Sequence, residues 1–146
     1  MEAAPSYTRV LLCVDFSESA ARVSARAADI ARRHQARLYL LHVLDHVPAD
    51  AVGEFLSPQQ VDTHERLAQD ARERLEQAAV AMGFPDAVSI VAAGHTRHEI
   101  VQHAEELGCD LIVVGSHGRH GLALLLGSTA RAILHGAACD VLAVRI

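Results

Sequence analysis

Short apolar runs alternate with helix-forming stretches along the whole sequence, and this alternation limits the folds that the chain can adopt. The apolar runs occupy 10–14, 38–44, 88–92, 110–115 and 141–145. The stretches expected to be helical occupy 18–34, 58–82, 97–108 and 128–136. Continuous apolar runs are typical of strands covered on both faces, as in parallel sheets. Parallel neighbours need crossover helices, so the alternation predicts a doubly wound α/β sheet with helices on both faces.

Two helix ends carry local signals of their own. Thr96 and Glu99 have the spacing of a capping box, which predicts a helix that begins near Arg97. Gly108 is expected to end the same helix, because glycine readily adopts the left-handed conformation found after a helix.

Length and composition favour one domain and exclude several classes of function. The 146 residues suit a single domain, 1–146, and 51% hydrophobic with 21% charged residues argues against disorder and against a membrane protein. A net charge of −5, 3% aromatic residues and no Trp argue against nucleic-acid binding. A polar start without a secretory signal and three scattered cysteines predict a cytoplasmic protein with inert thiols.

The segment after the fourth expected strand carries the strongest functional signal. Gly115, Gly118 and Gly127 let the backbone approach a phosphate, and Ser128 at a helix start adds a hydroxyl and free N–H groups. Glycines also serve tight turns and close helix packing, so their spacing alone leaves both interpretations open. In a doubly wound sheet, ligands bind beyond the carboxyl ends of the strands, where Asp15 and Gly115 lie.

The chain resembles the universal stress protein family over nearly its whole length. The resemblance rests on four segments, VLLCVDFS at 10–17, LHV at 41–43, DLIVVGSHGR at 110–119 and CDVLAVR at 139–145. It implies a five-stranded parallel sheet in the order 3-2-1-4-5 and a homodimer paired through the last strand. In one branch of the family it also implies ATP bound at the ends of strands one and four.

The ATP-binding branch is marked by Gly, two residues, Gly, nine residues, and Gly followed by Ser or Thr. Gly115, Gly118, Gly127 and Ser128 match this pattern, but eight residues, 119–126, stand where the pattern has nine. The shorter loop either bends at Gly121 or displaces Ser128, and both outcomes stay open. Because all three glycines are present, we favour the nucleotide-binding branch.

The resemblance implies a role for each site residue. Asp15 would lie near the adenosine and near a phosphate-bound Mg²⁺, although the same carboxylate could instead cap the first helix. Val43 would offer backbone groups to the adenine edge. The ribose and phosphates would be held by Gly115, Gly118, Gly127, Ser128 and Thr129. His117 and Arg119 would either face phosphate or lie in solvent.

Catalytic and resident-metal motifs are missing from the sequence. The ten histidines do not have metal-ligand spacing, and the sequence has no nucleophile elbow, no CxxC pair and no Lys. Without an evident base, any ATP hydrolysis is expected to be slow, and we do not expect an enzyme.

The sequence leaves three functions open. The first is an ATP-, ADP- or AMP-binding regulatory module of the stress response that acts on an unidentified regulatory protein. The others are a nucleotide-free dimeric interaction protein and a weak ATPase. In each case the edge strand from Val141 to Val144 is expected to pair two copies, because an exposed edge invites aggregation.

Overall fold

The structure, a computed structural model, describes residues 2–44, 58–116 and 126–146. Within them, strands and helices alternate as the sequence predicts. The elements, in chain order, are β1 (Arg9–Cys13), α1 (Ala20–His34), β2 (Arg37–Leu44), α2 (Pro58–Ala81), β3 (Val88–Ala93), α3 (Thr96–Leu107), β4 (Leu111–Gly115), α4 (Ser128–Gly136) and β5 (Asp140–Val144).

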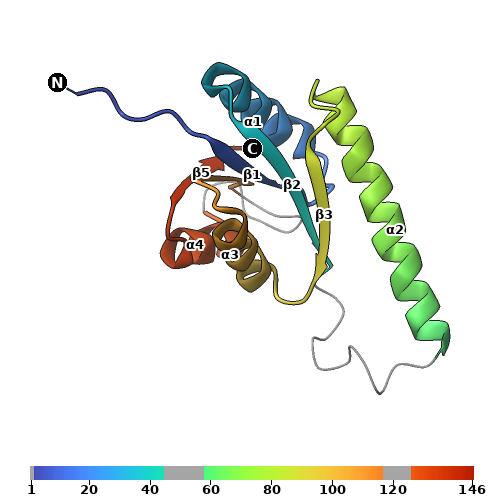
Figure 1. Cartoon of the computed structure of the whole chain (residues 1–146). Coiled ribbons are helices and arrows are strands. Elements are labelled where there is room, and N and C mark those ends of the chain that lie inside the picture. Colours follow the sequence, from blue (N-terminus) through green and yellow to red (C-terminus); the bar gives the residue numbers. More distant parts are fainter. Residues whose placement is uncertain (1, 45–57, 117–125) are drawn as a thin grey trace.

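The strands form one parallel five-stranded sheet in the order β3-β2-β1-β4-β5, which confirms the predicted fold class and strand order (Figure 1). β1 lies at the centre, and its register pairs Val10 with Leu38 of β2 and with Leu111 of β4. Because the chain moves to one side of β1 first and to the other side later, the point of reversal lies between the carboxyl ends of β1 and β4.

The two faces of the sheet are covered by different pairs of helices. Leu12 and Val113 pack with residues of α1 and α2, whereas Leu11 and Ile112 pack with residues of α3 and α4. All four of these strand side chains are fully buried, because successive side chains of a central strand point into opposite halves of the core.

The start of α3 differs from its prediction by one residue. His95, not Thr96, is the residue that caps the helix, and its side chain makes no capping hydrogen bond. The His95 carbonyl accepts the Glu99 N–H at 2.9 Å, so the first turn closes one residue early. The Glu99 carboxylate instead lies 3.6 Å from His103 Nδ1, and the predicted capping box is therefore wrong.

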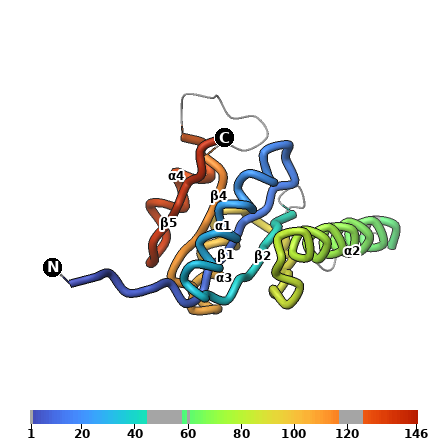
Figure 2. Tube along the Cα trace, turned by 90° about the horizontal axis from the view of Figure 1, so that it is seen from above, coloured from blue at the N-terminus to red at the C-terminus, as the bar shows by residue number. Residues whose placement is uncertain are grey.

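The start of the chain is tied across the amino edge of the sheet. The Asp110 carboxylate accepts the Thr8 N–H at 2.8 Å, the Thr8 hydroxyl at 3.0 Å and the Arg9 N–H at 3.0 Å. The Tyr7 hydroxyl donates to Asp140, at the start of β5, at 2.8 Å. Residues 2–6, here called the amino-terminal arm, are exposed and belong to no helix or strand. Figure 2 shows the arm running outward on the β5 side of the molecule.

In the part of the chain that the structure describes, no helix combines the length and the apolar content needed to cross a membrane.

Candidate functional site

Asp15 lies directly beyond the carboxyl end of β1. The Val14 N–H still donates to the Leu41 carbonyl at 2.8 Å, so β1 follows β2 until the residue before Asp15. The Asp15 carboxylate accepts the Ser17 N–H at 3.0 Å. The cap of α1 is Ser19, four residues later, so the alternative role of Asp15 as the helix cap is wrong.

The end of β4 and the start of α4 are joined by a short hydrogen bond. The Gly127 N–H donates to the Ser116 carbonyl at 2.6 Å, and the Ser116 N–H donates to the Val144 carbonyl of β5 at 2.8 Å. Continuing the register that pairs Leu12 with Val113 places Asp15 level with Ser116. The structure therefore brings Asp15, Gly115 and Gly127 to the same edge of the sheet, at the point of reversal.

The first turn of α4 has the properties of an anion-binding helix start. Gly127 is its cap, with φ −60° and ψ 153°, and no acidic side chain lies in the first turn. Ser128 and Thr129 are exposed. The first N–H groups of a helix have no partners within the helix, and the helix dipole favours negative charge beside them.

Val43 lies on β2, level with Ala92 of β3. Backbone groups of successive strand residues point to alternate sides, and the Leu41 carbonyl points toward β1. Val43, two residues on, therefore directs its N–H and C=O groups toward the side of β2 where β1 has already ended. The adenine contact that the resemblance implies for these backbone groups stays a prediction.

The remaining predicted site residues, His117, Gly118 and Arg119, lie outside the described residues, as does Gly121.

A stack of three side chains at the same edge was missed by the sequence analysis. Phe16 adopts the left-handed conformation, with φ 57°, and its ring centroid lies 4.4 Å from that of His42. The Arg74 guanidinium of α2 lies 4.0 Å from the Phe16 centroid. His42 Nδ1 donates to the Val14 carbonyl at 2.6 Å. Bulky residues with positive φ are rare and cluster at functional sites, but no sequence pattern announces this one.

Among the described residues, the three cysteines and the possible metal ligands are further candidates for reactive groups. The cysteines are free, and burial raises the pKa of Cys13 above its usual range and that of Cys109 to about 11. Both thiols therefore stay protonated near neutral pH, as inert thiols do. Across the described ranges, no three His, Cys, Asp or Glu side chains gather into a possible metal site.

Comparison with known proteins gives a consistent result. The model of the universal stress protein family matches residues 6–145. Universal stress protein A homolog 1 of Coxiella burnetii is 41% identical over 138 residues, which cover 94% of this chain and 96% of the relative. Among solved structures, UspA from Lactobacillus plantarum is 28% identical with a TM-score of 0.74, over 95% of this chain and 98% of that one. A universal stress protein solved in complex with cAMP is 25% identical with a TM-score of 0.66, over 96% of this chain and 98% of that one.

Proposed function

The chain belongs to the universal stress protein family, and from this membership we propose that it is an adenine-nucleotide-binding regulatory module of the stress response. ATP, ADP or AMP is the ligand, Mg²⁺ accompanies the phosphates, and the protein acts as a cytoplasmic homodimer on a regulatory protein partner. The cAMP complex of a family member with 25% identity supports the adenine nucleotide as ligand class.

The observation that carries this proposal is the hydrogen bond between Gly127 and Ser116. It holds the open N–H groups of α4 at the end of β4, across the point of reversal from Asp15. Phosphates favour such N–H groups, and a carboxylate oxygen such as that of Asp15 is a ligand that Mg²⁺ accepts. The chemistry of the donors therefore fits both parts of a magnesium nucleotide.

The proposal assigns each part of the nucleotide to a part of the edge. The backbone of Val43 contacts the adenine edge, and the first turn of α4, with Gly127, Ser128 and Thr129, holds phosphate. Gly115 permits the close approach of ribose and phosphate at the end of β4. His117, Gly118 and Arg119 belong to the loop between them and complete the phosphate contacts.

The proposed role is binding, not efficient catalysis. The Asp15 carboxylate accepts the Ser17 N–H, and the sequence offers no evident general base to orient an attacking water. Bound ATP is therefore hydrolysed slowly at most.

Thermal unfolding with and without millimolar Mg-ATP tests the proposal, with Mg-GTP as a control for the base. Ligand at a hundredfold over its Kd adds about 2.7 kcal/mol to the free energy of unfolding, which raises the midpoint by several degrees. The protein is first freed of co-purified nucleotide. No rise with Mg-ATP contradicts nucleotide binding and favours the nucleotide-free interaction protein, whose crevice the shortened loop would close.

A glycine substitution tests the site itself. The backbone angles of Gly127 are open to any residue, so Gly127→Leu crowds the phosphate position without imposing backbone strain. We expect the variant to fold and to lose the rise with Mg-ATP. Gly136→Ala, at the other end of α4, is the matched control, because its new Cβ would make an ordinary 3.6 Å contact with Val101. Unchanged affinity in Gly127→Leu contradicts the site assignment.

A further inference from the structure

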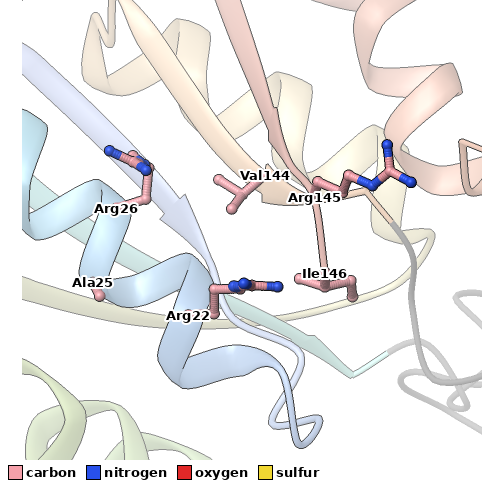
Figure 3. Close-up of a pocket in the computed structure, with 6 residues that line it drawn as sticks. All are labelled: Arg22, Ala25, Arg26, Val144, Arg145 and Ile146. Carbon is pink, nitrogen blue, oxygen red and sulfur yellow. The ribbon is translucent and has the colours of Figure 1, made fainter. Parts of the chain in front are cut away.

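A hollow of about 630 Å³ lies between α1 and the carboxyl end of β5. Figure 3 shows that Val144 and Ile146 point toward α1, whereas the Arg145 guanidinium points away from it. The α1 side of the hollow is formed by Arg22, Ala25 and Arg26. The hollow thus has an apolar wall on the strand and two guanidinium groups on the helix, and none of the described residues that line it is acidic.

The amino-terminal arm has the matching chemistry. It consists of Glu2, Ala3, Ala4, Pro5 and Ser6, that is, one carboxylate followed by three small apolar residues. All five are exposed in the single chain. Tyr7, the residue after the arm, is held in place because its hydroxyl donates a hydrogen bond to Asp140 at the amino end of β5. Figure 2 shows the arm leaving the molecule on that side.

We propose that the hollow binds the amino-terminal arm of a second copy of this chain. The inference rests on the proposed homodimer through β5. When two β5 strands pair antiparallel about a two-fold axis, the amino end of one lies beside the carboxyl end of the other, and the α1 faces lie on the same side. Tyr7 packs with the α1-side core, so the arm enters the second copy on the face where its hollow opens.

The order of residues along the arm fits the order of surfaces that it meets. Leaving Tyr7, the chain passes Pro5 and the two alanines before it reaches Glu2. In the second copy it meets the apolar wall of β5 first and Arg22 and Arg26 of α1 behind it. The root of the arm precedes β1, which lies two strands from β5, so the arm must pass about three strand spacings of about 5 Å to reach β5 of the second copy. Five extended residues span roughly 17 Å, which covers this distance, and the long side chains of Glu2 and Arg22 extend toward each other over the remaining sheet-to-helix distance of about 10 Å.

Dimer affinity, measured by sedimentation equilibrium on the full chain, tests the contact between Glu2 and Arg22. Glu2→Arg removes an ion pair that occurs twice in a two-fold dimer. A partly exposed pair is worth about threefold in affinity, so both pairs together predict a dimer about tenfold weaker. Arg22→Glu should weaken it similarly, and the double variant Glu2→Arg with Arg22→Glu should recover most of the loss. Raising the salt concentration should shrink these differences.

Exposed charges far from β5 supply the matched controls. Glu76→Arg and Arg72→Glu, both on α2, should leave the dimer affinity unchanged. A wild-type dimer that is unaffected by either substitution in the Glu2–Arg22 pair overturns the inference but leaves the proposed homodimer in place. Two weakened single variants that do not rescue each other also overturn it, because they show no direct contact. A wild-type monomer at micromolar concentration overturns the homodimer and this inference together.

Discussion

Replacing Asp110 by alanine would release the start of the chain from the sheet. Its carboxylate accepts three hydrogen bonds, two from backbone N–H groups and one from the Thr8 hydroxyl, at 2.8 to 3.0 Å. These bonds join the first residue of β1 and the residue before it to the residue before β4. Asp110→Ala removes all three acceptors and introduces no larger group.

The cost can be worked out from these bonds. A hydrogen bond to a charged group contributes about 1.5 to 3 kcal/mol, but the carboxyl of Asp110 is only half-buried and water competes for its donors. We therefore take about 0.7 kcal/mol for each bond. Three such bonds give about 2 kcal/mol at pH 7, which corresponds to a midpoint about 4 to 8 °C lower.

The loss should depend on pH in a defined direction. Partial burial alone would raise the pKa of Asp110, but the hydrogen bonds from Thr8 and Arg9 outweigh it and hold the pKa below its usual value. A carboxyl with a lowered pKa contributes its full stability above its unfolded pKa of about 3.9. The contribution is lost as the pH falls through the folded pKa. The difference between wild type and variant should therefore be constant from about pH 5 to 7 and shrink below pH 4.

Urea unfolding of wild type and Asp110→Ala at several pH values measures this difference. Asp70→Ala, an exposed carboxylate on α2, is the control and should change the free energy of unfolding by less than about 0.5 kcal/mol. Equal stability of Asp110→Ala and wild type at pH 7 would refute the reasoning. A difference that grows on acidification would refute the assigned direction of the pKa shift.

Three further outcomes follow from single contacts. Arg74→Ala removes the guanidinium above the Phe16 ring and should cost about 0.5 to 1 kcal/mol in urea unfolding, against almost nothing for Arg72→Ala on the same helix. Gly108→Ala places a side chain at φ 66° after α3 and should cost about 1 kcal/mol or more in the same assay; a neutral result would contradict the left-handed end of the helix. Burial raises the pKa of Cys109 to about 11, so its thiol should react with a disulfide reagent at pH 8 far more slowly in the folded protein than in urea. Equal rates would contradict that burial.

The fold was accessible from the sequence because each strand is marked by a mainly apolar run, and the runs of β1, β2 and β4 are largely buried. β1 and β4 are interior strands of the sheet, and helices cover both of their faces. Their buried residues are therefore apolar without a break, whereas a strand with one face in water alternates apolar and polar residues. The start of α3 was misplaced because Thr96 and Glu99 have the right spacing, yet His95 adopts the extended conformation of a cap. Spacing alone does not determine which residue takes that conformation.

The candidate site was accessible only in part. Asp15 and Gly115 follow strands, so the topology brings them together once the strand order is known. The contact of Phe16 with His42 and Arg74 joins three elements through side chains, and no local pattern encodes it. The anchoring of Thr8 by Asp110 likewise joins residues 102 positions apart. Such contacts depend on how the elements pack, which periodicity does not describe.

The central position of β1 also affects how the protein is made. β1 pairs with β4, about 100 residues later in the chain, through Val10 and Leu111. At 5 to 20 residues per second, a ribosome needs roughly 5 to 20 s to synthesise the intervening segment. During this time β1, β2 and β3 can assemble, but the most buried strand still presents one unpaired edge. A nascent chain therefore passes through a stage in which the free edge of β1 can pair with strands of other chains. A chaperone that covers this edge would prevent such pairing until β4 emerges.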